Sequence, residues 1–336
     1  MRAFRYESLP GRVVFGVGAS RTALAEEVTA RRVLVLATKR GLPLARELTA
    51  PLGNRVVGEF TDVREHVPVE IAEQARTHAK ELDADCLLSI GGGSTVGTAK
   101  AVALELRLPI VAVPTTYAGS EMTPVWGMTE NSSKRTGRST DVLPELVVYD
   151  PALTTDLPPD ITATSAMNAM AHSVEGVYAA GANPVSSLMA VDSVRALATG
   201  LPTAVADGSD LTARTELLYG AYLAGAVFAV AGSGPHHKIC HVLGGAYGLP
   251  HAATHSVMLP HVAELMEGPA LIPVADALGA TTAAQGLREL ATHVGAPTSL
   301  VGIGFDKRKL GEAAALVAER VSVSEVDIRS LLAAAL

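Results

Sequence analysis

Short β-rich runs of apolar residues alternate with helical patterns in the first half of the chain. The segments between the runs repeat apolar positions at helical spacing. Strands that alternate with helices in this way indicate a parallel sheet with crossover helices. The stretch after the last run predicts a loop, a hairpin-like excursion and a returning strand. The runs are RVLVLAT (32–38), RVVGEF (55–60), CLLSI (86–90) and IVAVP (110–114).

The pattern changes to helical periodicity alone beyond Asp150. A proline-bearing connector, PALTTDLPPDIT, leads into segments in which Ala, Leu and Val recur at helical spacing. We therefore expect an α/β dinucleotide-binding domain over residues 1–156, followed by an all-α substrate domain over residues 157–336. The expected helices lie at roughly 161–178, 184–200, 211–230, 236–246 and 309–320.

One run in the second half, Leu217 to Pro235, carries no charge over a length that could span a membrane. It contains several glycines and many alanines, and it leads directly into a group of histidines. Small residues permit close packing of helices in soluble proteins too. We expect a buried central helix and no membrane partner.

Composition and charge narrow the class of partner. The chain has 27 Lys plus Arg against 34 Asp plus Glu, a net charge of -7, and no dense basic tract, which argues against nucleic-acid binding. The two cysteines, Cys86 and Cys240, fit a reducing compartment, and the opening MRAFRYESLPGR lacks the apolar core of a secretory signal. We expect a cytoplasmic protein with a small-molecule substrate.

A glycine run follows the strand expected at Asp85–Ile90. Gly91, Gly92, Gly93 and Ser94 precede a helical pattern that starts at Thr95. Glycines let the backbone approach a pyrophosphate closely, and the N–H groups and dipole at a helix start favour the anion. Because many strand-to-helix turns need glycine only for geometry, the run becomes a candidate cofactor site only together with its neighbours.

Hydroxyl groups follow the next strand end. Thr115, Thr116 and Ser120 would lie at the carboxyl edge of the same sheet, where α/β proteins bind ligands. Lys134, in the predicted hairpin, is a candidate contact for a cofactor phosphate or a substrate carboxylate. The alternatives are a polar turn that caps a helix and an exposed hairpin charge. Two polar turns at adjacent strand ends favour a nucleotide.

The usual dinucleotide fingerprint is incomplete, because Gly16-Val17-Gly18 lacks its third glycine. No acidic residue ends RVLVLATKR to bind ribose hydroxyls, whereas Lys39 and Arg40 are either contacts for a 2′-phosphate or solvated cations. The sequence therefore predicts NADH, NADPH or both as the cofactor, without choosing between them.

Two pairs of polar residues recur at a spacing of four. Asn168 and His172 form one pair and His237 and His241 the other, so on helices each pair shares a face; His251 follows in a Leu-Pro-His turn. Three imidazoles and a carboxylate would make a cage for a divalent metal, but Asn168 offers only a neutral amide. For any single histidine, a satisfied structural role is the alternative.

The motifs GGGS, VPTT, NAMAHSVEG and HHKICHVLGGAYGLPHA, in this order, resemble the iron-containing (group III) alcohol dehydrogenase family over nearly the whole chain. PTTYAGSEMT and the Asn in NAMAH are most similar to the branch that reduces maleylacetate. The resemblance implies a dehydroquinate synthase-like two-domain plan and a homodimer. It also implies NAD(P)H-dependent reduction of the carbon–carbon double bond of maleylacetate, a dicarboxylate, to 3-oxoadipate in aromatic-compound degradation.

The resemblance also implies site residues. In the metal-dependent relatives the four ligands would fall on Asn168, His172, His237 and His251, with His241 a nearby catalytic histidine. Asn168 replaces their aspartate, so we expect no metal. The enolate oxygen would then be stabilised by imidazoles and the amide rather than by a Lewis acid. His241 or His172 would donate the proton, and His237 and His251 would bind the oxyanion or a carboxylate.

Two other enzyme classes remain as alternatives. The first is a metal-dependent alcohol or polyol dehydrogenase that tolerates Asn168, with three histidines holding Zn or Fe. The second is a lyase resembling dehydroquinate synthase, which uses NAD without net redox change. Loss of turnover on removal of metal would indicate the former, and stoichiometric oxidation of NADH would exclude the latter.

Overall fold

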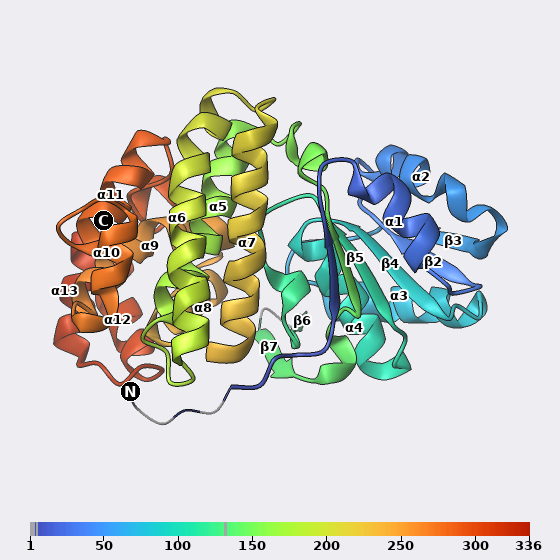
Figure 1. Ribbon diagram of the computed structural model, residues 1–336. Helices are drawn as coiled ribbons and strands as arrows, with labels where there is room; N and C mark the ends of the chain where they lie inside the picture. The colour runs from blue at the N-terminus through green and yellow to red at the C-terminus, as the bar shows by residue number, and fades with distance from the viewer. Residues whose placement is uncertain (1–3, 5, 131–132) are drawn as a thin grey trace. The chain divides into compact units, whose positions relative to one another are not determined.

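The computed structural model describes residues 4, 6–130 and 133–336, with the backbone alone for Ser133 and Lys134. The chain forms two compact units, each described by itself below (Figure 1). The α/β unit is Leu9–Thr155. The helical unit is Asp156–Leu336 together with the described residues among the first eight.

A parallel sheet forms the centre of the α/β unit, which confirms the predicted fold class. Six strands run in the order β1-β8-β5-β4-β2-β3, and an antiparallel hairpin, β6-β7, stands apart from them. The inner strands β2 and β5 are buried along their whole length, as expected where helices cover both faces of a sheet. The strands are β1 (Arg12–Phe15), β2 (Val33–Leu36), β3 (Val56–Phe60), β4 (Cys86–Gly91), β5 (Ile110–Pro114), β6 (Val125–Glu130), β7 (Ser133–Arg138) and β8 (Leu146–Tyr149).

Two separate apolar cores lie on the two faces of this sheet. Val33 and Val35 belong to the core that includes Leu24 of α1, whereas Leu34 and Leu36 belong to the core that includes Ile71 of α3. This division follows from the two-residue period of a strand, which sends successive side chains to opposite faces. The helices are α1 (Ala19–Glu27), α2 (Leu42–Thr49), α3 (Val69–Glu81) and α4 (Gly93–Leu106).

The first and last strands of the α/β unit are neighbours. β1 pairs with β8 in parallel, with Arg12 opposite Leu146 and Phe15 opposite Tyr149. The predicted elements began at Arg32 and did not include β1 or α1. A four-residue strand with an exposed first residue leaves only a weak signal in the sequence.

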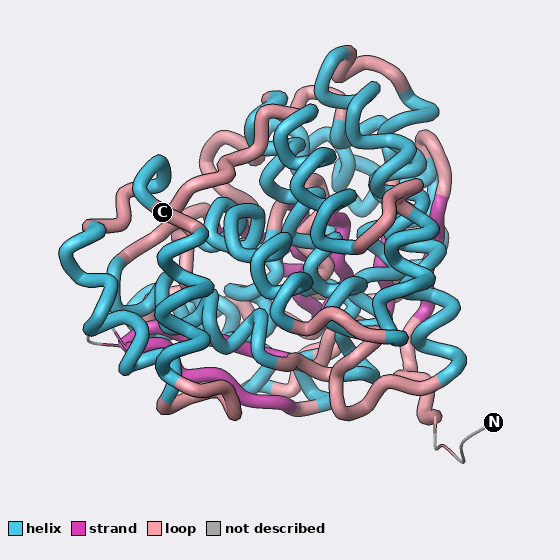
Figure 2. The backbone as a smooth tube through the Cα atoms, turned by 90° about the vertical axis from the view of Figure 1, so that its left-hand side faces the viewer, coloured by secondary structure: helices cyan, strands magenta, loops and turns pink. Residues whose placement is uncertain are grey.

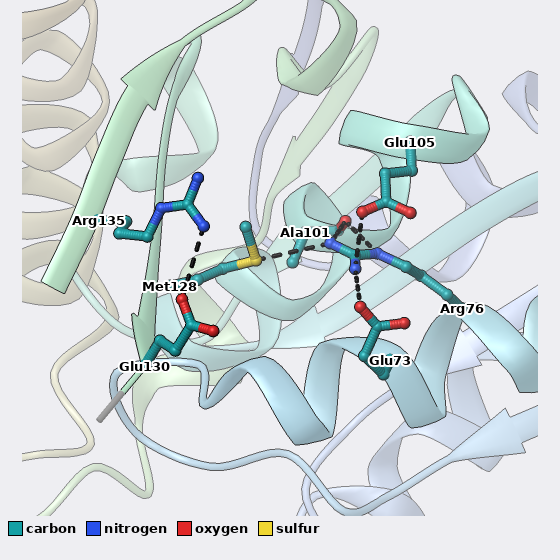
Figure 3. Close-up of polar contacts among 7 residues, drawn as sticks. All are labelled: Glu73, Arg76, Ala101, Glu105, Met128, Glu130 and Arg135. Carbon is teal, nitrogen blue, oxygen red and sulfur yellow. Dashed lines mark hydrogen bonds and ion pairs between the residues drawn. The ribbon is translucent and has the colours of Figure 1, made fainter. Parts of the chain in front are cut away.

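Arg76 of α3 ties α4 and the hairpin to the rest of the α/β unit (Figure 3). Its buried guanidinium donates to the carbonyl oxygen of Ala101 at 3.0 and 3.1 Å, and it contacts the sulfur of Met128 at 3.5 Å. Carboxylates of Glu73 and Glu105 each lie 2.8 Å from its Nη1. These contacts fix the position of α4, the helix that follows the glycine loop.

The helical unit contains no strand among the residues that the structure describes, as predicted, and Figure 2 shows the abundance of helix in the chain. α6 begins with a capping box in which Asn183 and Ser186 exchange hydrogen bonds. α6 and α7 approach closely, because a Cβ on Gly200 would lie 2.7 Å from the carbonyl oxygen of Ala213. The helices are α5 (Pro159–Gly176), α6 (Pro184–Ala206), α7 (Leu211–Ala231), α8 (Pro235–Tyr247), α9 (His251–Leu265), α10 (Ile272–Ala277), α11 (Ala283–His293), α12 (Leu310–Ala318) and α13 (Glu325–Ala334).

The uncharged run predicted as a buried helix forms most of α7. No single helix among the described residues is long and apolar enough to cross a membrane, and α7 and α8 meet that test only as a pair bent by 101°. The bend follows Gly232, whose φ of 78° ends α7.

Candidate active site

The glycine loop joins β4 to α4 in the α/β unit. Gly91 has a φ of 150°, and a Cβ there would lie 2.5 Å from Oγ1 of Thr95. α4 starts after Gly92 with no side-chain cap and no acidic residue in its first turn. Oγ1 of Thr95 is buried and makes no hydrogen bond among the residues described here. The loop thus offers N–H groups and a hydroxyl suited to a phosphate, with Ser94 at the start of the helix.

The second predicted polar turn lies directly against this loop. The N–H of Thr115 donates to the carbonyl oxygen of Gly91 at 3.1 Å. A Cβ on Gly92 would lie 3.0 Å from the side chain of Thr116, so a larger residue at 92 would displace that threonine. The structure therefore brings Gly91, Gly92, Gly93, Thr95, Thr115 and Thr116 together.

Ser120 is held by a buried lysine that the sequence analysis missed. Nζ of Lys100 donates to the carbonyl oxygens of Ser120 and Thr123, both at 2.6 Å, and of Val125 at 2.8 Å. Burial lowers the pKa of Lys100 to about 7, although the nearby carboxylate of Glu121 acts in the opposite direction. Lys100 thereby fixes the loop that carries Ser120 to α4. In the sequence it is an ordinary lysine in a helical pattern.

Lys134 lies in β7, with its backbone opposite Thr129. Its side chain is outside the described part of the structure, so its predicted contact with a phosphate or carboxylate stays a prediction.

The incomplete fingerprint at Gly16-Val17-Gly18 precedes α1, and the N-terminus of that helix is already occupied. The carboxylate of Asp150 accepts from the N–H of Gly18 at 2.9 Å and from the N–H and hydroxyl of Ser20 at 3.2 and 2.5 Å. A protein carboxylate thus stands where an anionic ligand would otherwise bind.

Four predicted histidines form a continuous series of ring contacts in the helical unit. The rings of His172 (α5) and His237 (α8) stack with centroids 5.0 Å apart and planes 14° apart. His237 lies 6.2 Å from His241, which lies 6.1 Å from His251 at the start of α9. Helical spacing within α5 and α8 thus brings the predicted residues into one cluster.

Asn168 and His172 share one face of α5, as the spacing predicted, in a part of the helix (Ser165–Gly176) that is buried all round. Oδ1 of Asn168 and Nδ1 of His172 are buried and form no hydrogen bond within the described part of the chain. Burial, followed by the proximity of His237, lowers the pKa of His172 to about 3. This face therefore presents neutral polar groups.

Glu175 is the main residue of this cluster that the sequence analysis missed. It is fully buried on α5, and its carboxylate makes a very short contact with Nδ1 of His237. The same carboxylate accepts the backbone N–H of His236 at 2.7 Å. Its sequence signal was its position, three residues after His172 on the same helix.

A second group of ring nitrogens and a thiol lies beside the predicted residues. Nε2 of His236 and Nδ1 of His255 are 2.9 Å apart, and Sγ of Cys240 is 3.7 Å from the same nitrogen of His236. Burial lowers the pKa of both histidines, to about 3 for His236, and raises the pKa of Cys240 well above its usual value. The separation of 2.9 Å is that of a hydrogen bond, so one of the two rings donates and the other accepts.

The donor set does not fit the metal that the family name implies. Asn168 contributes a neutral amide, which is a much poorer ligand for a divalent metal than a carboxylate. The ligand atoms of His172, His237 and His251 do not form a group within 4.8 Å in the part of the chain that the structure describes. The His236, Cys240 and His255 group does meet that spacing, but it is held by a hydrogen bond.

Comparison with known proteins identifies the family of the chain. The family model "Iron-containing alcohol dehydrogenase" matches residues 10–151, and the model of the C-terminal part of the same family matches residues 162–327. Maleylacetate reductase of Sphingobium indicum is 49% identical, over 93% of this chain and 90% of that protein.

Solved structures agree with this assignment. The crystal structure of maleylacetate reductase from Rhizobium sp. strain MTP-10005 is 42% identical, with a TM-score of 0.95 and coverage of 100% of this chain and 99% of that one. A 1,3-propanediol oxidoreductase is 27% identical, with a TM-score of 0.88 and full coverage of both chains. The chain belongs to the iron-containing alcohol dehydrogenase family and is an oxidoreductase closely similar to maleylacetate reductases.

Proposed function

We propose that this protein reduces the carbon–carbon double bond of maleylacetate to give 3-oxoadipate, with NADH or NADPH as reductant and without a bound metal. The observation that carries the proposal is the buried, neutral face formed by Asn168 and His172. Relatives named maleylacetate reductase that align over most of the chain support the choice of substrate. We also propose a homodimer, as the family resemblance implies, and a cytoplasmic location, which the two cysteines fit.

The proposed chemistry requires a stabilised enolate and one proton. When bound, the nicotinamide supplies a hydride to the alkene carbon remote from the ketone, and the electron pair of the double bond moves toward the ketone oxygen. The amide N–H of Asn168 would donate to that oxygen. His241 would deliver the proton to the carbon next to the ketone, because the low pKa of His172 leaves it neutral. His251 would bind a substrate carboxylate.

We propose that the cofactor phosphates bind at the N-terminus of α4. The buried hydroxyl of Thr95 and the uncapped first turn of α4 support this site, with Gly91, Gly92, Gly93 and Ser94 as its loop. Thr115, Thr116, Ser120 and Lys134 are proposed as the remaining contacts.

The test is consumption of NADH and of NADPH with freshly prepared maleylacetate, before and after exhaustive chelation, with metal analysis of the same sample. Rapid turnover by metal-free protein is the expected result. Absence of turnover, or activity restored only by Zn or Fe, would contradict the proposal.

A metal-dependent alcohol dehydrogenase is the second candidate, and one observation favours it. A buried carboxylate on the far ring nitrogen of a histidine, as in Glu175 and His237, is typical of histidines that bind metals. The substitution Asn168→Asp would supply the missing anionic ligand. We expect it to tighten Zn binding by roughly tenfold, about 1.4 kcal/mol, in a calorimetric titration. Stoichiometric Zn already bound to the unsubstituted protein would instead support this second candidate.

A further inference from the structure

We infer that Glu175 is a positioning residue that fixes the tautomer and the ring orientation of His237, with the proton on Nδ1. The consequence for catalysis rests on the proposed function. The assignment of the tautomer itself rests on the contacts below.

The carboxylate of Glu175 collects donors from the first turn of α8. It accepts from the backbone N–H groups of His236, at 2.7 Å, and of His237, at 3.4 Å, and it contacts Nδ1 of the His237 ring. α8 has no side-chain cap of its own, so Glu175, which comes from α5, performs that function. The carboxylate of Glu175 thus caps the N-terminus of α8 and also binds the side chain of His237 on the same helix.

The glycine before α8 makes room for this arrangement. A Cβ on Gly234 would lie 2.9 Å from Oε1 of Glu175 and 3.2 Å from its Cδ. Gly234 has a φ of -120°, which any residue adopts, so the backbone does not demand glycine there. Its smallness is needed because the carboxylate occupies the adjacent space.

The protonation pattern follows from the chemistry of the partners. A buried carboxylate is costly unless donors and a helix N-terminus compensate its charge, and Glu175 has both. An ionised carboxylate only accepts hydrogen bonds, so Nδ1 of His237 must carry the proton. In the neutral ring Nε2 is then the acceptor.

Neighbouring rings hold His237 in this orientation. The ring of Phe228 lies 4.6 Å from it and that of His255 4.7 Å, while His172 stacks on it at 5.0 Å. Rotation of the imidazole would require these side chains to repack. Glu175 and the surrounding rings therefore select one tautomer and one direction for Nε2.

This assignment changes the role of His237 in the proposed reaction. In a neutral His237 with its proton on Nδ1, the other nitrogen, Nε2, can only accept a hydrogen bond. His237 therefore does not donate a hydrogen bond to the enolate oxygen. That donation falls to other groups, of which Asn168 is the first.

The test is ¹⁵N NMR of protein labelled selectively at histidine, without substrate, with the His237 signal identified from its loss in His237→Gln. We expect the pattern of a ring protonated on Nδ1. In Glu175→Gln the amide oxygen would keep the backbone N–H groups and the NH₂ would face Nδ1, so the ring should change to the Nε2-protonated tautomer. Glu121→Gln, which removes another buried carboxylate, should leave the signal unchanged.

A second variant protects the test against misfolding of Glu175→Gln. Gly234→Ala keeps the carboxylate but displaces it, and a mixture of tautomers is expected. An Nε2-protonated ring in the unsubstituted protein, or a spectrum that neither variant changes, would overturn the inference.

Kinetics provide the functional readout. We expect Glu175→Gln to lower kcat for maleylacetate on the order of 10- to 100-fold while the KM for NAD(P)H stays within about twofold. An equal kcat would contradict the positioning role. Because NMR needs no turnover, failure of the proposed substrate and failure of this inference are distinguishable.

Discussion

The N-termini of α4 and α8 have the same local sequence features but different surroundings. Each helix follows a glycine and lacks a side-chain cap of its own. Neither first turn contains an acidic residue, but in the helical unit the carboxylate of Glu175 occupies the start of α8, whereas no carboxylate of the described residues accepts a hydrogen bond from the first turn of α4. The same local feature therefore has two consequences. At α8, Glu175 binds the backbone N–H groups and orients His237. At α4, the N–H groups are suited to binding an anionic ligand.

The largest expected effect is a loss of stability on removal of Glu175 from the N-terminus of α8. Glu175→Ala would leave two backbone N–H groups and the ring of His237 without their acceptor in a buried place. We expect the free energy of unfolding in urea to fall by about 3–5 kcal/mol. Glu289→Ala, on the exposed part of α11, should change it by less than about 0.5 kcal/mol. A small loss for Glu175→Ala would mean that water replaces the carboxylate.

The second effect is a loss of stability at lower pH that comes from buried histidines of the helical unit. His172 and His236 have a pKa of about 3 in the folded protein because they are buried, below the ordinary 6.5. Their contribution to stability is present above pH 6.5 and is lost as pH falls toward 3, since the unfolded chain takes up protons first. Between pH 7.5 and 5.5 we expect a loss of about 1 kcal/mol for each histidine.

The measurement for this prediction is urea denaturation at the two pH values. The variant His66→Gln, which removes an exposed histidine of the α/β unit, should keep the full pH dependence. Equal stability at both pH values would show that the buried rings take up protons in the folded state.

A smaller effect is expected on cofactor binding at the N-terminus of α4. Gly92→Ala would place a Cβ 3.0 Å from Thr116 and disturb the backbone that faces the proposed phosphate. We expect the Kd of NADH or NADPH, measured by fluorescence titration, to rise roughly 10- to 100-fold, about 1.4–2.8 kcal/mol. Gly311→Ala, in α12 with open space around the added methyl, is the matched control and should leave the Kd unchanged.

The smallest expected effect comes from placing a carboxylate at the N-terminus of α4, where it would resemble Glu175 at the N-terminus of α8. Ser94→Asp should weaken binding of the dinucleotide by about tenfold, because the new charge repels the phosphates, while stability rises by about 0.3–1 kcal/mol. Ser94→Asn adds the same bulk without charge and isolates the electrostatic part. Equal Kd values for the two variants would argue against a phosphate at this place.

Periodicity in the sequence predicted most of the fold. β5 lies at Ile110–Pro114, where the apolar run was placed, and α7 at Leu211–Ala231 is within one residue of its predicted bounds. β1 and α1 were missed, as were α9, α10, α11 and α13. The regions around β1 and α10 carry short or irregular apolar patterns, which do not distinguish a buried element from a loop.

The sequence predicted that the candidate histidines lie close together, but it did not predict the contacts that support them. Spacing of four placed Asn168 and His172 on one face, as the structure has them. Glu175 and Lys100 were missed because their acceptors and donors lie 20 to 62 residues away in the sequence. In the sequence, a buried charged residue cannot be distinguished from an exposed one, because its hydrogen-bond partners come from distant parts of the chain.

The pairing of β1 with β8 affects how the chain folds during synthesis. Arg12 and Leu146, which face each other in the sheet, are 134 residues apart (146 minus 12). At roughly 5–20 residues per second, β1 would leave the ribosome roughly 7–27 s before its partner strand is made. We therefore expect the α/β unit to complete its sheet only late in translation, and β1 to need protection from other strand edges until then.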